Sequence, residues 1–213
     1  MWQPLSFSLA SFFCGVFLLA TAATAQVPAM TFSVGYSNLQ TQKTDNLFYN
    51  HDGAYVDADF SWRLPLNIPL QVGIGATGSG HWERQSTFVP LDNTYYPYDH
   101  LYSDLGLFEL EPRIGLRLGN PTGFFFTPRI GAGLLIDSYA IDQTITNSNG
   151  TYLNTQYHTG AAFEVRPALQ AGYCWGPAAA GIEASYMWSW GDFGELGRHA
   201  DEFRVGAFFS LNF

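Results

Sequence analysis

The chain has 213 residues, of which 47% are hydrophobic and 17% aromatic, and its formal net charge at pH 7 is −9. This length suits one domain, and so acidic a chain is not expected to bind nucleic acid. Cys14 and Cys174 are the two cysteines, and Cys14 falls in a segment that we expect to be removed, so no intramolecular disulfide is predicted.

The N-terminal segment has the pattern of a secretory signal peptide. Residues 5–23 are almost uncharged and apolar, and Ala23-Thr24-Ala25 provides the small residues of a cleavage site before Gln26. A retained membrane helix is the alternative, but the apolar block is shorter than the ~20 residues that a span needs. We therefore expect a cleaved signal peptide over residues 1–25 and one mature domain over residues 26–213.

Eight stretches of the mature sequence alternate apolar residues with polar or small ones. They cover residues 30–36, 56–64, 70–77, 108–118, 126–137, 163–173, 182–189 and 203–213. Successive side chains of a strand point to opposite faces, so each stretch predicts a strand with one apolar and one polar face. Eight is the smallest usual number of strands in a closed membrane barrel. The sequence therefore predicts an all-β fold, a closed eight-stranded antiparallel up-and-down transmembrane β-barrel.

The connections between these stretches alternate in length. Residues 65–69, 119–123 and 175–177 are short and rich in turn formers, whereas residues 38–53, 83–105, 138–159 and 191–200 are longer and polar. This alternation predicts three short turns at one end of the barrel and four outer loops at the other. Both termini are then expected at the end with the short turns.

The inward face is predicted to carry a network of acids and arginines. An eight-stranded barrel is only wide enough for its own side chains to fill, and arginine holds carboxylates in bidentate pairs. The charged residues of the inward parity are Asp57, Asp59, Arg63, Glu109, Glu111, Arg113, Arg117, Arg129, Asp137, Glu164, Arg166, Glu183, Glu202 and Arg204. We predict that they form a polar plug. A gated ion path is the alternative, because inward glycines at 73, 75, 131, 133, 172, 181 and 206 leave space for water.

Three prolines fall inside predicted strands. Pro112, Pro128 and Pro167 all occupy the outward parity. A closed barrel has no free edge on which a missing N–H goes unnoticed. We therefore predict local bulges or kinks at these positions.

The chain ends in Phe208-Phe209-Ser210-Leu211-Asn212-Phe213, with a Phe at the last position. Together with the signal peptide and the alternating loop lengths, this ending resembles small eight-stranded outer-membrane barrels of the OmpA transmembrane-domain, OmpX and opacity-protein type. The resemblance implies that Phe209, Leu211 and Phe213 form a C-terminal signal for the barrel-assembly machinery. It also implies a bacterial outer-membrane location, with periplasmic termini and contact with outer-membrane lipid and lipopolysaccharide.

The expected role is non-enzymatic, as an envelope scaffold or as a surface-interaction protein that binds an extracellular ligand through the four outer loops. A narrow porin-like channel is the first alternative, and a lipid A-modifying enzyme is the second. Such deacylases use His with Ser and an acid, but the nearest grouping here, Ser79-Gly80-His81, reverses the His-x-Ser spacing of that family and faces inward. No catalytic residue, cofactor or metal site is therefore predicted.

Overall fold

The computed structural model describes residues 28–42, 48–64, 66, 68–91, 94–147, 150–191 and 198–213. The predicted signal peptide over residues 1–25 lies outside the described residues, so the boundary after residue 25 stays a prediction. Within the described ranges, no helix is long and apolar enough to cross a membrane.

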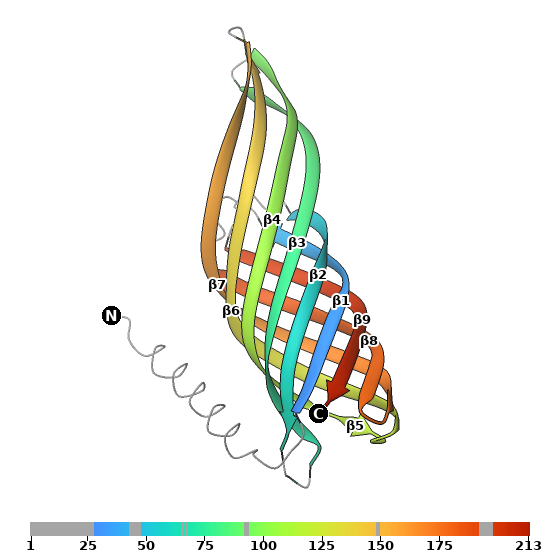
Figure 1. Cartoon of the computed structure of the whole chain (residues 1–213). Helices are drawn as coiled ribbons and strands as arrows, with labels where there is room; N and C mark the ends of the chain where they lie inside the picture. The colour runs from blue at the N-terminus through green and yellow to red at the C-terminus, as the bar shows by residue number, and fades with distance from the viewer. Residues whose placement is uncertain are drawn as a thin grey trace, which may run out of the picture.

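One antiparallel sheet contains all the strands. They are β1 Pro28–Gln42, β2 Phe48–Arg63, β3 Leu70–Leu91, β4 Thr94–Leu116, β5 Leu118–Gly119, β6 Gly123–Asn147, β7 Gly150–Trp175, β8 Ala178–Gly191 and β9 His199–Asn212. The sheet order is β4-β3-β2-β1-β9-β8-β7-β6-β5, and a further pairing of β4 with β6 closes the sheet on itself (Figure 1). The short β5 continues β4, because it pairs with β6 in the same register. The fold is therefore a closed eight-stranded up-and-down barrel, which confirms the predicted fold class.

Side chains alternate across the barrel wall as predicted. In β9, Phe203 and Phe209 are each 43% exposed on the outside, whereas Arg204 is fully buried inside. Phe208, which breaks the alternation in the sequence, is buried on the inside and packs against Phe125 with ring centroids 6.1 Å apart. The outside of the wall is thus mainly apolar and the inside largely polar, the reverse of a soluble barrel.

Short turns join the strands at one end of the barrel, called here the turn end. Gly119, Gly123 and Gly176 have φ angles of 122°, 139° and 85° there. Side chains with a Cβ rarely adopt this left-handed region, which explains why glycine occupies these positions. The short connections predicted at 119–123 and 175–177 are confirmed.

Both described ends of the chain also lie at the turn end. The N–H of Phe213 donates to the carbonyl of Pro28 at 2.9 Å. The N–H of Asn212 donates to the carbonyl of Pro177, in the turn between β7 and β8, at 2.7 Å. The first and last strands therefore begin and finish beside a short turn.

At the opposite end, called here the hairpin end, paired strands extend past the closed wall (Figure 1). The β3–β4 pairing continues to Leu91↔Thr94, and the β6–β7 pairing continues to Asn147↔Gly150. The loops predicted over residues 83–105 and 138–159 are therefore wrong, since most of these residues are strand. The β1–β2 pairing likewise reaches Gln42↔Phe48. Residues 192–198 of the fourth predicted loop separate β8 from β9, and 192–197 lie outside the described residues.

The composition of these segments explains the error. These segments lack the alternation of apolar and polar residues that identifies a strand, so their sequence resembles a polar loop. Its strand propensity is still visible in β-branched runs such as Thr144-Ile145-Thr146. The irregularities in pairing also lie here, between Gln85 and Thr87 and between Tyr98 and Leu101.

The bulges predicted at the three prolines are wrong. The pairing register is the same on both sides of Pro112, Pro128 and Pro167. At each proline, the strand loses pairing with only one of its two neighbours. The β4–β6 pairing skips residues 111–112, and the β7–β8 pairing skips residues 166–167. Opposite Pro128, β4 ends and β5 begins. Proline removes a donor toward one neighbour alone, so pairing with the other neighbour holds the register.

The turn glycines provide a matched test of this wall geometry. A Cβ on Gly176 would meet nothing within 4 Å, whereas a Cβ on Gly119 would overlap the carbonyl oxygen of Phe124. We expect Gly176→Ala to lower the free energy of unfolding by about 1 kcal/mol through its backbone angle alone. Gly119→Ala should cost clearly more, because backbone strain and overlap add. Urea unfolding in lipid vesicles, followed by tryptophan fluorescence, measures both, and equal losses would contradict the close approach at Gly119.

Candidate functional site

The barrel interior is layered along its axis. Toward the hairpin end lies an apolar layer formed by Leu39, Leu105, Leu107, Leu135, Tyr139, Ala162, Met187 and Ala200. Toward the turn end lies a second apolar cluster formed by Phe125, Cys174, Ala179 and Phe208. In β7, β8 and β9 the buried charges lie between residues of the two clusters: in β9, Ala200 precedes Glu202 and Arg204, and Phe208 follows. This charged layer is the candidate site.

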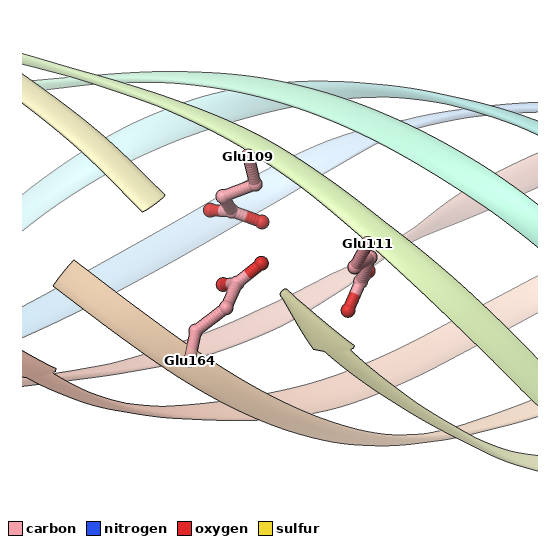
Figure 2. Close-up of side chains that lie close together, drawn as sticks. All are labelled: Glu109, Glu111 and Glu164. Atoms are coloured by element: carbon pink, nitrogen blue, oxygen red, sulfur yellow. The ribbon is translucent and has the colours of Figure 1, made fainter. Parts of the chain in front are cut away.

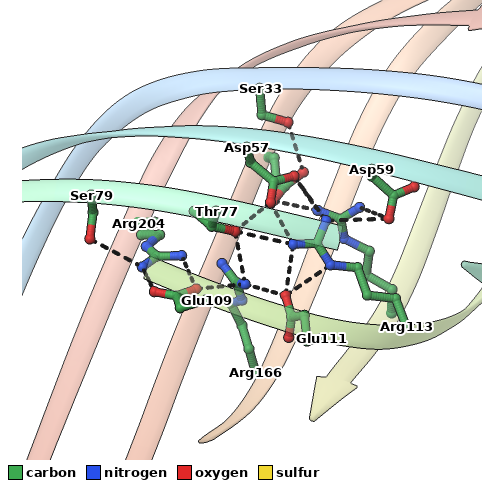
Figure 3. Close-up of polar contacts among 12 residues, drawn as sticks. Ser33, Asp57, Asp59, Thr77, Ser79, Glu109, Glu111, Arg113, Arg166 and Arg204 are labelled. Atoms are coloured by element: carbon green, nitrogen blue, oxygen red, sulfur yellow. Dashed lines mark hydrogen bonds and ion pairs between the residues drawn. The ribbon is translucent and has the colours of Figure 1, made fainter. Parts of the chain in front are cut away.

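Arg113, from β4, organises the turn-end side of the charged layer (Figure 3). Its Nη1 donates to Asp57 Oδ2 at 2.9 Å and its Nη2 to Asp57 Oδ1 at 2.5 Å. Its Nε donates to Glu111 Oε1 at 2.8 Å, and its Nη1 reaches Asp59 Oδ2 at 3.3 Å. The side chain is 5% exposed, so these carboxylates, rather than water, compensate its charge.

Arg166 and Arg204 hold the carboxylates nearer the hairpin end. Arg166 Nη2 lies 2.7 Å from Glu109 Oε2 and also contacts Glu111, which Arg113 shares. Arg204 donates from Nη1 to Glu109 Oε2 at 2.9 Å and from Nε to Glu202 Oε1 at 2.8 Å. Arginines and carboxylates therefore alternate along the axis, each carboxylate being shared or bridged (Figure 3).

Arg129, from β6, connects the network to β8 as well as to β2. Its Nη2 lies 2.6 Å from Glu183 Oε1 in β8 and 3.9 Å from Asp57 Oδ2 in β2. Glu183 also accepts a hydrogen bond of 2.7 Å from Gln170 in β7. One network of charges thus connects strands that are not neighbours in the sheet, which fixes how the walls face each other.

His81, from β3, ends the network toward the hairpin end. Its Nε2 lies 3.1 Å from Glu202 Oε1 and 3.0 Å from Ser37 Oγ, while Nδ1 has no hydrogen-bond partner in the described part of the chain. A nucleophile–His–acid triad uses two different ring nitrogens, whereas both contacts here use one. His81 is only 2% exposed. This grouping therefore lacks the geometry and the access of a hydrolytic site.

Two of the predicted interior arginines lie outside this network. Arg63, on the inward parity of β2, is exposed. It is the last residue of β2, where the wall ends and a long side chain reaches water. Arg117 is half-buried at the break between β4 and β5, and its guanidinium lies 3.9 Å from the ring centroid of Phe125.

Two of the predicted acids are buried without an arginine contact among the described ion pairs. Asp137 lies between the apolar-layer residues Leu135 and Tyr139 along β6, and its Oδ2 is 3.5 Å from Nε2 of His158. Glu164 is fully buried, and neither of its oxygens has a hydrogen-bond partner among the described residues. Glu164 is thus the uncompensated member of the charged layer.

The space beside the inward glycines is filled by the network itself. A Cβ on Gly75 would overlap the guanidinium of Arg113, and a Cβ on Gly131 would overlap the carboxylate of Glu111. The glycines therefore accommodate large charged side chains, and at these positions they leave no room for the water path that the sequence suggested.

Sequence reasoning missed the apolar layer, although its signal is present. Leu105 and Leu107 precede Glu109 on the same parity of β4, and Met187 follows Glu183 on the same parity of β8. Inward leucines at the loop-side end of several strands were the available clue. They predict an interior that is polar in the middle and apolar at that end.

A recess opens into the interior from the turn end. Its lining includes Asp59, Gln71, Arg113, Arg129, Phe125 and Phe208. The turn-end side of the charged layer is therefore reachable from that end. The residues of the apolar layer lie on the hairpin-end side of these charges in β4, β7 and β9.

Comparison with known proteins gives distant similarity only. No family model and no curated protein matches the chain. Among solved structures, Ail, the attachment invasion locus protein of Yersinia pestis, is 13% identical, with 86% of this chain and 98% of that chain covered and a TM-score of 0.48. Neisserial surface protein A is 11% identical, with 87% and 99% covered and a TM-score of 0.48.

The outer membrane protease OmpT from Escherichia coli is 13% identical, with 88% of this chain and 97% of that chain covered and a TM-score of 0.43. Identities and scores this low do not transfer a function to this chain. The function must be inferred from its own residues.

Arg113 and Arg63 provide a test of the network. Arg113→Ala leaves Asp57 and Glu111 buried without their main partner, so we expect it to lower the free energy of unfolding by about 3–5 kcal/mol. Arg63→Ala, the same change at an exposed position, should stay within about 0.5 kcal/mol of the wild type. Urea titration of both variants in phosphatidylcholine vesicles measures this difference. Similar stabilities would show that the network does not stabilise the barrel.

Proposed function

We propose that the protein is an integral barrel of the bacterial outer membrane that acts as a surface-interaction protein. The observation that carries this proposal is the open sheet that continues past the closed wall at the hairpin end, because its outer edges can accept another strand. The interior serves as a plug that holds the scaffold together.

The barrel exterior supports insertion into a membrane. Outward side chains such as Val56 and Ile182 are 61% and 66% exposed, and similar apolar side chains surround the wall. Soluble proteins rarely expose so continuous an apolar surface. A closed barrel also satisfies the backbone hydrogen bonds that a membrane requires, because it has no edge. Lipid therefore suits this surface better than water does.

The difference between the two ends of the barrel supports one orientation, because short turns close one end and hairpins extend past the wall at the other. In outer-membrane barrels the short turns face the periplasm and the longer connections face outward. The turn end and both described chain ends are then periplasmic, and the hairpins project toward lipopolysaccharide and the medium. Phe209 and Leu211 on the outer face of β9, and Phe213 directly after it, are exposed and would then be available to the barrel-assembly machinery at the periplasmic side.

Four strands continue past the wall in the order β3-β4-β6-β7. Pairing of β3 with β2 stops at Trp82, and pairing of β7 with β8 starts only at Ala162. Among the described residues, the segments 83–91 of β3 and 150–161 of β7 therefore border another strand on one side only. The outer edge of a sheet presents backbone N–H and C=O groups to an incoming strand.

The partner that fits these edges is an extended polypeptide segment. Main-chain hydrogen bonds supply affinity in strand addition, with little dependence on the partner's sequence. Because the chain carries a net charge of −9, a basic segment would approach faster than an acidic one. A surface-interaction function of this kind needs neither a cofactor nor a catalytic group.

Trimming the hairpins tests this function. Replacing residues 144–153 by an Asn-Gly turn shortens β6–β7 without removing a charged residue, and a second variant shortens β3–β4 by replacing residues 88–97. We expect the double variant to bind an immobilised, reduced and alkylated basic polypeptide at least tenfold more weakly than the wild type. Each single variant should lose part of the affinity.

Hydrogen exchange distinguishes strand addition from non-specific electrostatic attraction of the polypeptide to the acidic barrel, and a gel assay checks folding. Amides of residues 83–91 and 150–161 in the wild type should gain protection from hydrogen exchange when the polypeptide is added. The barrel of each variant must still migrate as a folded species on an unheated gel. Undiminished binding by a folded double variant would contradict the proposed function.

A narrow channel is the second candidate, and the recess at the turn end is the observation that favours it. Against it, buried apolar side chains narrow the interior toward the hairpin end, and side chains of the network fill the space beside Gly75 and Gly131. An apolar constriction blocks ions by excluding water. We expect single-channel recordings in planar bilayers to show no conductance steps, for the wild type and for an Arg113→Ala/Arg129→Ala variant. Reproducible steps that change in the variant would establish a channel instead.

A further inference from the structure

We propose that Glu109, Glu111 and Glu164 form a binding site for one hard divalent cation, Ca²⁺ or Mg²⁺, inside the barrel. This site lies beyond the proposed surface function and does not depend on it. Figure 2 shows the three side chains converging from β4 and β7.

The three carboxylates are close enough together to bind one metal ion. One oxygen from each lies within 4.8 Å of the others, and all three side chains are buried. Oxygens bound to Ca²⁺ at 2.3–2.6 Å lie at most about 4.6–5.2 Å apart across the ion. A single cation among them can therefore contact all three residues once Arg166 Nη2, which contacts both Glu109 and Glu111, moves aside.

Glu164 is the observation that points to a ligand. Both of its oxygens lack a hydrogen-bond partner among the described residues, and its carboxylate points toward Glu109 and Glu111 (Figure 2). Oε2 of Glu111 is also without a hydrogen bond. A buried carboxylate that neither bonds nor pairs is costly, so something must compensate it.

The charge of the whole layer supports this reading. Six carboxylates, those of Asp57, Asp59, Glu109, Glu111, Glu183 and Glu202, contact the four guanidinium groups of Arg113, Arg129, Arg166 and Arg204. Glu164 adds a seventh carboxylate beside them. The described network is therefore short of positive charge, and the shortage is greatest beside Glu164, which no arginine contacts at ion-pair distance.

The chemistry of the ligands selects the class of ion. All three donors are carboxylate oxygens, with no nitrogen or sulfur donor in the group. Hard cations such as Ca²⁺ and Mg²⁺ prefer oxygen ligands, whereas Zn²⁺ and Cu²⁺ favour sites with imidazole or thiolate. Arg113 lines the turn-end recess and donates to Glu111, so the site lies one side chain beyond that recess.

Metal stoichiometry tests the site directly. The folded mature chain in phosphatidylcholine vesicles, which carry no lipopolysaccharide to bind cations, is stripped with EDTA and then dialysed against 1 mM Ca²⁺ or Mg²⁺, the concentration being about that of extracellular sites. Elemental analysis should find about one retained ion per chain. The temperature at which the barrel unfolds on gels should rise with the ion and fall again with EDTA.

Two variants separate this site from the rest of the interior. Glu164→Gln removes the uncompensated charge, so it should fold well, bind less than a tenth of the wild-type metal, and show no shift with EDTA. Glu183→Gln is the matched control, because it removes a carboxylate of the same network that contacts Arg129 instead. It should retain the wild-type stoichiometry.

Three outcomes would overturn the proposal. One is a wild-type barrel that retains no ion and responds to neither cation nor EDTA. Another is equal binding by wild type and Glu164→Gln. The third is a wild-type barrel that gains the stability of Glu164→Gln on mild acidification alone, which would mean that Glu164 holds a proton.

Discussion

Charge compensation without bulk water is the condition on which this barrel depends. An eight-stranded wall encloses too little space for hydration, so each buried charge must be balanced by another side chain. Arg113, Arg166 and Arg204 meet this condition by holding carboxylates from several strands at once. The glycines of the wall follow from it, because a Cβ at Gly75 or Gly131 would occupy the space of the network. The interior chemistry therefore sets the composition of the strands.

The same condition links strands that never pair. Arg113 of β4 bonds Asp57 of β2, and Arg204 of β9 bonds Glu109 of β4 across the barrel. A slip of one residue in any ladder would turn an inward charge toward the apolar exterior. The network therefore fixes the register of the strands, as does the β4–β6 pairing that closes the barrel. This also explains how ladders interrupted at prolines can keep their register.

Period-two alternation made the strand count, the parity of β9 and the short turns predictable, because each is encoded locally. Ion-pair partners such as Arg129 and Glu183 were not predictable, since they depend on how far strands are staggered around the barrel. The extended hairpins were missed because residues 83–105 and 138–159 lack the period-two alternation that identifies a strand. The exposure of Arg63 was not predictable, because parity does not reveal where the wall ends. Parity did place Glu164 inside, but the lack of a compensating arginine required coordinates.

The apolar layer and the turn-end recess make the interior one-sided. In the proposed orientation, the recess opens the turn-end side of the charged layer toward the periplasm. A change of salt in the periplasm would then reach Asp59 and Arg113 through the recess. The stability of a surface protein would thus follow conditions inside the envelope that holds it.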